Sequence, residues 1–256
     1  MSMNKIFCFG DGFAANHIWP EWPAMVSALY PDCDVENFGA IGAGNEFIAS
    51  AAIDAHIKHP DAFFLIQWAM PNRFDKLIQD QTWDQIIDKD PVYHFNCVEQ
   101  NNRTWWLTSA SQRPEIRQYH KLYVQSAQAC LRTFNLIYLI GKLLVNKTIF
   151  FSTYKLPFDT QQKIALDFVP WVDIDMHGFS NLEKFKSVRG SQIQPRPEIH
   201  FNFLKEHVLP LMPVFPDLSR LHILEQRICE TVWEPYDPDR EEIWKNISNF
   251  SIPVNS

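Results

Sequence analysis

The sequence has little positive charge and no long apolar run. Among its 256 residues, 23 Lys and Arg stand against 30 Asp and Glu, so the formal net charge is −7. Nucleic acids and anionic membranes are bound through clustered positive charge, and we therefore expect neither as a partner. No apolar stretch reaches the roughly 18 residues of a membrane-spanning helix, so a transmembrane protein is not expected.

Paired cysteines are also missing. The five cysteines are scattered, odd in number and without a C-x-x-C spacing, which is typical of reduced thiols rather than of a disulfide framework. The N-terminal residues lack the apolar core of a signal peptide. We therefore expect a cytoplasmic protein. Hydrophobic residues make up 46% of the chain, which is enough for a folded core without metal or disulfide.

Strands and helices are predicted to alternate in the first part of the chain. Apolar runs at 5–9 and 62–68 predict strands, and the segment 33–38, which ends at Gly39, is predicted to be another. The segments 20–29 and 46–58 predict helices between them. Such strand–helix–strand units form parallel sheets with right-handed crossovers. The sequence therefore predicts an α/β protein with a doubly wound parallel sheet. Further along, we predict a helix at 114–146, a strand at 147–152 and a short helix at 202–209.

Two segments depart from this alternation. Residues 71–113 are polar, aromatic and poor in periodicity, and we predict an insertion over the edge of the sheet that could act as a lid. Residues 213–256 are predicted to be a C-terminal extension that wraps the domain. The main domain is then 1–212. The oligomeric state stays open.

Glycines gather where a ligand would bind. Five of the eight glycines fall between positions 10 and 44, in the loops after the first two predicted strands. Ligands of open α/β sheets bind at the carboxyl ends of the strands, and glycine lets backbone N–H groups approach them closely. The alternative is that Gly10 and Gly12 only make a tight turn, with Asp11 as a loop-fixing acceptor.

The first of these loops matches a dinucleotide fingerprint in its spacing. Gly10 to Ala14 fits G-x-G-x-x-A after a strand. That fingerprint needs a helix starting at the second glycine, yet Pro20 and Pro23 lie where the helix should run. It also needs an acidic residue at the end of the second strand, and none is there. We therefore expect no nucleotide cofactor, and no other cofactor.

The same loop resembles the opening Gly-Asp-Ser-Phe block of the SGNH/GDSL hydrolase family. The loop Asn37 to Gly42 is similar to the family's second block, Asn-x-Gly-x-x-Gly. At the end of the third strand, Trp68 followed by Arg73 is similar to a subgroup associated with phage and polysaccharide loci. Glu198-Ile199-His200 is similar to the final block. The resemblance covers about 4–75 and 195–210.

This resemblance implies a three-layer α/β/α sandwich of flavodoxin-like topology and a serine-esterase type of site. The expected substrate is a small-molecule or glycan ester, with an O-acyl group on a glycan as the specific case. The resemblance implies His200 as general base and Glu198 as its partner. Gly12 and Gly42 are the implied oxyanion donors, and Ala69 stands at the position of the family's oxyanion Asn. Asn45 and Arg73 are the implied ligand-binding residues.

Two groups that the family mechanism needs are absent from the sequence. The nucleophile position is Gly12, which has no hydroxyl, and Ala69 has no side-chain donor. Two alternatives follow. The chain is either an impaired ester hydrolase (a pseudoenzyme), whose activity Gly12→Ser would partly restore, or a non-catalytic glycan-binding or structural protein that keeps the fold. Whether it is an enzyme stays open.

Each of these side chains also has a purely structural interpretation. Asn45 could cap a helix, Arg73 and Glu198 could be solvated, and His200 could be a surface residue. Two patterns resemble metal ligands: His56-x-x-His59, and Asp173-x-Asp175-x-His177, whose members also offer a fallback acid–base pair. Neither pattern has a third well-spaced element, so we expect no metal site.

Overall fold

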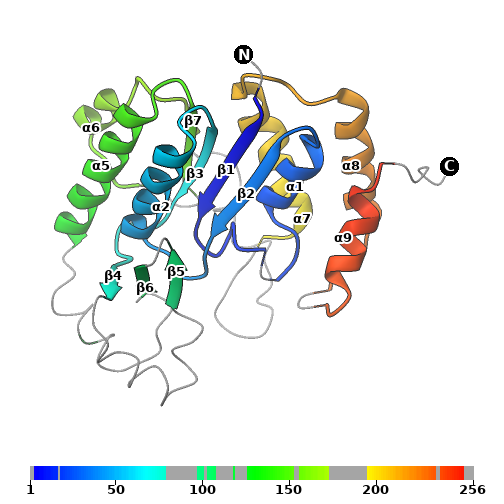
Figure 1. Ribbon diagram of the computed structural model, residues 1–256, viewed down its shortest axis with the longest axis horizontal. Coiled ribbons are helices and arrows are strands. Elements are labelled where there is room, and N and C mark those ends of the chain that lie inside the picture. The colour runs from blue at the N-terminus through cyan, green and yellow to red at the C-terminus, as the bar shows by residue number, and fades with distance from the viewer. Residues whose placement is uncertain are drawn as a thin grey trace.

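A five-stranded parallel sheet forms the centre of the molecule (Figure 1). The computed structural model describes residues 3–16, 18–78, 97–100, 103–107, 118, 126–152, 156–172, 195–234 and 237–250. The strand order is β2-β1-β3-β7-β8, with every neighbouring pair parallel. The strands are β1 (Lys5–Gly10), β2 (Asp34–Gly39), β3 (Phe63–Trp68), β7 (Thr148–Ser152) and β8 (Trp171–Val172). The sequence had predicted the first four strands but not the short β8.

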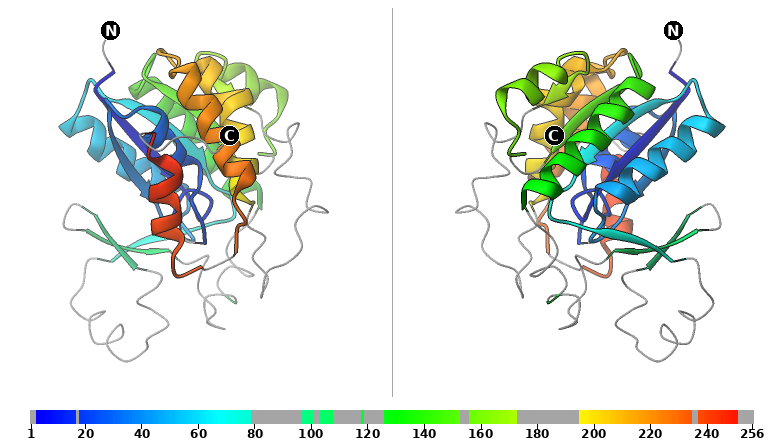
Figure 2. Two further views of the ribbon diagram at one scale, coloured as in Figure 1. Left: turned by 90° about the vertical axis from the view of Figure 1, so that its right-hand side faces the viewer. Right: turned by 90° about the vertical axis from the view of Figure 1, so that its left-hand side faces the viewer.

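Helices cover both faces of this sheet (Figure 2). The helices are α1 (Trp22–Leu29), α2 (Asn45–Lys58), α5 (Ser126–Leu143), α6 (Thr160–Ala165), α7 (Pro197–Phe203), α8 (Leu218–Glu230) and α9 (Arg240–Ser248). Alternate side chains of a strand point to opposite faces. Ile6 and Cys8 pack in one apolar cluster with α1, α7 and α8, whereas Phe7 and Phe9 pack in a second cluster with α2 and α5. The fold is therefore α/β, as predicted.

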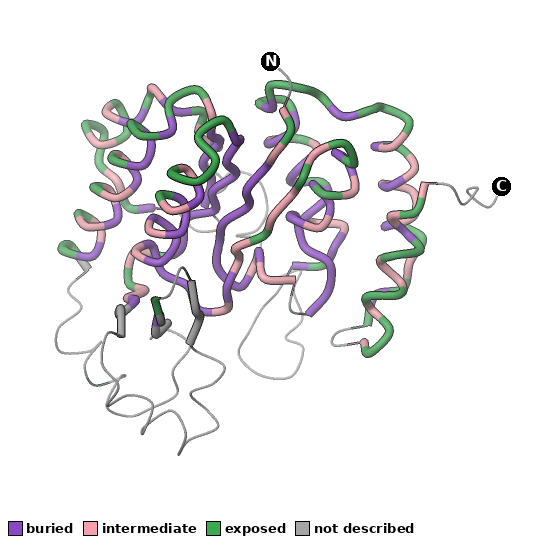
Figure 3. The backbone as a smooth tube through the Cα atoms, in the orientation of Figure 1, coloured by how far each residue is buried: buried purple, intermediate pink, exposed green. Residues whose placement is uncertain are grey.

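The central strands are mainly apolar because both of their faces are covered. Every residue of β3 is buried, as is every residue of β7 (Figure 3). This explains why the sequence shows continuous apolar runs instead of the alternation of a half-exposed strand. Gln67 is the polar exception in β3, and it lies near the carboxyl end of the strand, where the candidate site is.

Part of the predicted insertion at 71–113 is an antiparallel sheet. The strands β4 (Asp75–Ile78), β5 (Cys97–Gln100) and β6 (Arg103–Leu107) follow the order β4-β6-β5. Trp105 is buried edge-on against Phe47 of α2, with ring centroids 6.1 Å apart. Figure 1 shows this small sheet beyond the carboxyl ends of the main strands. Trp83 lies outside the described residues.

The C-terminal part differs from the sequence expectation in two ways. The helix predicted at 202–209 already begins at Pro197, and after Phe203 it continues as a π-helical turn, Leu204–Val208, and a 3₁₀ turn, Leu209–Leu211. The predicted extension contains α8 and α9, whose buried residues belong to the same apolar cluster as α1 and α7. In the described part of the chain, no helix is both long and apolar enough to cross a membrane.

Candidate functional site at the carboxyl edge of the sheet

The loops after β1 and β2 are packed directly against each other. The Ala40 amide donates to the Gly10 carbonyl at 3.1 Å, and the Asn37 amide group donates to the Ala14 carbonyl at 2.7 Å. A Cβ on Gly39 would lie 2.3 Å from the Ala14 oxygen, which is closer than atoms can approach. Gly39 is therefore required by close backbone packing.

Asp11 is fully buried and joins the loops after β1 and β3. Its Oδ1 accepts from the Phe13 amide at 3.0 Å and from Gln67 Nε2 at 2.6 Å. Its Oδ2 lies 2.9 Å from Nη1 of Arg73. Gln67 in turn accepts from the Trp22 indole at 2.8 Å. The interpretation of Asp11 as a loop-fixing acceptor agrees with these contacts.

Arg73, proposed as a ligand clamp, is engaged by the protein itself. Besides its ion pair with Asp11, it donates to the Ala43 carbonyl in the loop after β2 at 3.1 Å. The segment that follows β3 is held from a second side by Arg132 of α5. Arg132 donates to the Arg73 carbonyl at 3.0 Å and pairs with Glu46 at 2.6 Å. The three strand-end loops thus form one cross-linked unit.

Asn45 is not the helix cap that the sequence suggested. The N-cap of α2 is Gly44, and Asn45 lies in the first turn with its side chain buried. Its Oδ1 accepts from the Ala69 amide at 2.8 Å, and its Nδ2 donates to the Ala69 carbonyl and to Thr133, each at 3.0 Å. Asn45 therefore fixes the end of β3 to α2 and α5, and Ala69 is fully buried beneath it.

Asp75 is a site residue that sequence reasoning missed. Its two carboxylate oxygens each lie 2.9 Å from the Gly44 amide, and one of them also accepts from the Phe47 amide at 2.9 Å. Asp75 thus caps α2 from the start of β4. Burial is the main cause that raises its pKa to about 7, with Glu46 adding to the rise, while the Phe47 and Gly44 amides and Arg73 oppose it.

Glu21 is a second buried acid that the sequence did not reveal. It precedes α1, and it exchanges two hydrogen bonds with Asn16: the Asn16 amide donates to Oε2 at 2.8 Å and the Glu21 amide donates to Asn16 Oδ1 at 2.9 Å. Asn16 has a positive φ of 51°. Burial raises the pKa of Glu21 well above its usual value, and the negative charge of Asp11 adds to the rise. The only sequence signal was an acidic residue between two prolines.

His200 is completely buried, not at the surface. It lies one turn into α7, and burial lowers its pKa to about 3, with the Pro195 carbonyl opposing the shift. The Trp19 indole also donates to the Pro195 carbonyl, at 2.6 Å. This bond brings the start of α7 next to the loop after β1. A histidine with such a pKa is neutral at physiological pH and resists gaining a proton.

The structure does not bring Glu198 and His200 together as a pair. Both lie inside α7, and residues two apart on a helix point about 200° apart around its axis. Glu198 faces α8, where its negative charge contributes to raising the pKa of Cys229. Its Oε2 is buried and has no hydrogen-bond partner among the described residues. A carboxylate placed this way cannot orient the His200 ring.

Gly12 and Gly42, the two expected oxyanion donors, are both buried in the strand-end loops. Gly42 has a φ of 80°, which a side chain would disfavour. Gly12 is not followed by a helix, since α1 begins only at Trp22. This arrangement lacks the helix N-terminus that binds pyrophosphate in dinucleotide-binding folds.

The structure describes only one of the two metal-like patterns. His56 and His59 lie at the C-terminal end of α2, where their rings pack on Phe64 and Phe7. Among the described residues, no group of three or more His, Cys, Asp or Glu side chains could hold a metal ion. The pattern at 173–177 lies outside those residues.

Taken together, this edge of the sheet presents polar side chains that are bonded to one another. Asp11, Asn45, Arg73 and Asp75 fix the strand-end loops to one another and to α2. A comparison with models of known protein families finds no match to the chain, and a comparison with curated proteins finds none either.

Proposed function

We propose that the chain is an SGNH/GDSL-hydrolase-like protein, with the three-layer sandwich of that family, which has lost ester hydrolysis and binds its ligand without turning it over. The strand order, the helices on both faces and the contact between the loops after β1, β2 and β3 support this fold assignment. The free thiols of Cys8, Cys33, Cys130 and Cys229 support a cytoplasmic location.

One observation carries the proposal: the side chains that catalysis would need are absent or already bonded within the protein. Position 12 has no hydroxyl, position 69 has no side-chain donor, and Asn45 uses both Nδ2 donors within the protein. An oxyanion hole requires donors that are free to face the developing charge. His200 is completely buried, and burial lowers its pKa to about 3, so it is a weak base that is not presented to a substrate either.

The ligand class that we propose is a small-molecule or glycan ester, with O-acylated glycans as the specific case. Its support is the family resemblance together with the position of the β4–β6–β5 sheet beyond the strand ends, where it could cover a bound sugar.

The experiment combines a reactivity test with a binding test. The purified chain is treated with a fluorophosphonate serine probe and with an aryl acetate, and we expect no labelling and no turnover above buffer. O-acetylated oligosaccharides and their de-acetylated counterparts are then compared by calorimetry, with preferential binding of the acetylated forms expected. Labelling, turnover, or equal binding of both sugar forms would contradict the proposal.

A residual ester hydrolase is the second candidate. It is favoured by the cross-linking of the three strand-end loops through Asp11 and Arg73, because the family mechanism needs these loops in contact. The discriminating measurement is acetate release before and after His200→Gln. Turnover that disappears in a folded variant would establish the hydrolase and exclude the non-catalytic protein.

A further inference from the structure

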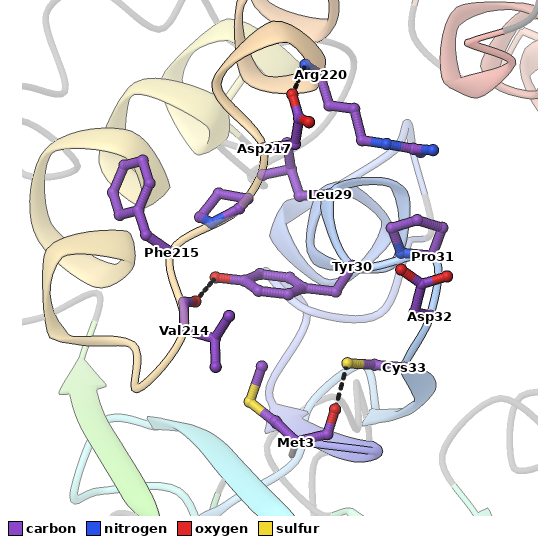
Figure 4. Close-up of a pocket in the computed structure, with 11 residues that line it drawn as sticks. Met3, Leu29, Tyr30, Pro31, Asp32, Cys33, Val214, Phe215, Asp217 and Arg220 are labelled. Carbon is purple, nitrogen blue, oxygen red and sulfur yellow. Dashed lines mark hydrogen bonds between the residues drawn. The ribbon is translucent and has the colours of Figure 1, made fainter. Parts of the chain in front are cut away.

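A pocket of about 480 Å³ lies at the opposite end of the sheet from the loops just described (Figure 4). One side is formed by the end of α1 and the residues before β1 and β2, including Leu29, Tyr30 and Cys33. The other side is formed by the segment between the 3₁₀ turn and α8, including Phe215 and Arg220. Its volume falls in the range of sites for small organic ligands.

The polar groups of the wall are mostly satisfied within the protein. The Tyr30 hydroxyl donates to the Val214 carbonyl at 2.9 Å, and the Cys33 thiol donates to the Met3 carbonyl at 2.8 Å. Asp217 caps α8, accepting from the Ser219 amide at 2.7 Å. What remains for a ligand is an apolar surface made mainly of aromatic, proline and aliphatic side chains.

Arg220 is the cation of this pocket. Its guanidinium lies over the Phe250 ring, 4.7 Å from the centroid, and it forms no ion pair with any residue in the described part of the chain. Asp217, which caps α8, lies in the same wall; hydrogen bonds from Ser219 and from the Arg220 amide lower its pKa, and the charge of Arg220 adds to that effect. Asp32, the acid on the opposite side, is exposed. An anionic group beside Arg220 would therefore gain a charge-assisted hydrogen bond.

The mouth of the pocket is apolar and open to solvent. Val214 and Phe215 are 44% and 49% exposed, and Leu218 next to them is 71% exposed. Flat walls from Tyr30 and Pro216 suit a planar ring. From the cavity, its apolar lining and Arg220, which has no ion pair among the described residues, we propose that this is a second binding site that takes a small aromatic carboxylate, with the ring against Tyr30 and the carboxylate on Arg220.

The first test compares two probes that differ only in charge, 2-naphthoate and 2-naphthalenemethanol. We expect calorimetry to give a Kd on the order of 100 µM for naphthoate, as its size allows, and binding at least about tenfold weaker for the alcohol. In Arg220→Gln the two affinities should become equal. In Arg103→Gln, which changes an exposed arginine on β6, the difference should persist.

The second test uses opposite charges at one exposed position. Val214→Lys should tighten naphthoate binding and Val214→Glu should weaken it, while both variants fold because the side chain is half exposed. In the unmodified chain, naphthoate should slow alkylation of Cys33 and leave that of the exposed Cys229 unchanged.

Three outcomes would overturn the proposal: equal affinity for both probes in the unmodified chain, the same shift in both Val214 variants, or equal protection of Cys33 and Cys229. The site does not involve the carboxyl edge of the sheet, so these outcomes leave the proposed function untouched.

Discussion

Arg73 and Asp11 form an ion pair across two strand-end loops, with Nη1 of Arg73 2.9 Å from Oδ2 of an aspartate that is completely buried. The pair joins the loop after β1 to the segment after β3, and Arg73 extends the link to the loop after β2 through the Ala43 carbonyl. The carboxyl edge of the sheet is therefore held by a buried aspartate whose cationic partner is Arg73.

The first prediction concerns that ion pair. Arg73→Gln leaves the Asp11 charge buried without its cation, and we expect a loss of about 3 kcal/mol in the free energy of unfolding, measured by urea denaturation. Adding Asp11→Asn should recover part of the loss, since the amide oxygen still accepts from Phe13 and Gln67. Arg103→Gln, at an exposed pair, should change stability by less than about 1 kcal/mol. Equal effects of the two arginine substitutions would contradict this account.

The second prediction concerns Asn45. Asn45→Ala removes three hydrogen bonds and leaves the buried amide and carbonyl of Ala69 without their partner. Unsatisfied buried polar groups are costly, and we expect a loss of about 2–4 kcal/mol in urea denaturation. The matched control is Asn135→Ala on the exposed side of α5, where a change within about 0.5 kcal/mol is expected. A small effect at Asn45 would mean that the end of β3 is held by other contacts.

The third prediction concerns pH and Asp75. The pKa of Asp75 is about 7 in the folded protein, against an ordinary value of 3.8. Between about pH 4 and pH 7, the folded state therefore keeps a proton on Asp75 that the unfolded state has lost. The contribution of Asp75 to stability is therefore largest below about pH 4 and falls as the pH rises to about 7. Asp75→Asn should remove this fall, which is on the order of a few kcal/mol.

The measurement is the free energy of unfolding at about pH 4.5 and pH 7.5 for the original chain, Asp75→Asn and Asp61→Asn. Asp61 is almost fully exposed, so its variant should keep the original pH dependence. Glu21 is common to all three proteins and cancels in the comparison, whereas Glu46 interacts with Asp75, so any change in the titration of Glu46 is part of the measured difference. An unchanged pH dependence in Asp75→Asn would contradict the assigned shift.

The sheet could be predicted from the sequence because its strands carry their own signal. Continuous apolar runs such as Phe63 to Trp68 are typical of strands covered on both faces. The two-residue β8 is too short to show any periodicity. The start of α7 was missed because Pro197, which suits the first turn of a helix, reads as a helix breaker in a run of prolines and polar residues.

The position of the glycine loops was predictable, but their hydrogen bonds were not. The glycines at 10–44 lie at the carboxyl ends of β1 and β2, the edge at which parallel sheets bind ligands. Asp75 caps α2, which begins thirty residues earlier in the chain, and no local sequence pattern predicts such a contact. Burial of His200 likewise depends on the packing of α7 against distant elements, and the pair of Glu198 and His200 that the family resemblance implied is separated by the helix geometry.

The last prediction concerns Gly12→Ser. Among the described glycines only Gly42 has a positive φ, so the backbone at position 12 accepts a side chain without conformational strain. The sequence alone predicted partial rescue of ester hydrolysis, but the buried His200 argues for none. Its pKa of about 3 makes it a poor proton acceptor, and Glu198 faces α8. Without an activated base, a serine hydroxyl stays a weak nucleophile.

We therefore expect Gly12→Ser to fold and to remain unlabelled by a fluorophosphonate, with acetate release equal to that of the Gly12→Ala control, which carries the same Cβ without the hydroxyl. Ala69→Asn should not help, because Ala69 is fully buried and a larger side chain there displaces Asn45. Labelling of Gly12→Ser that is abolished by His200→Gln would reverse the conclusion, because the histidine would then reach position 12 in solution and the chain would be a dormant esterase.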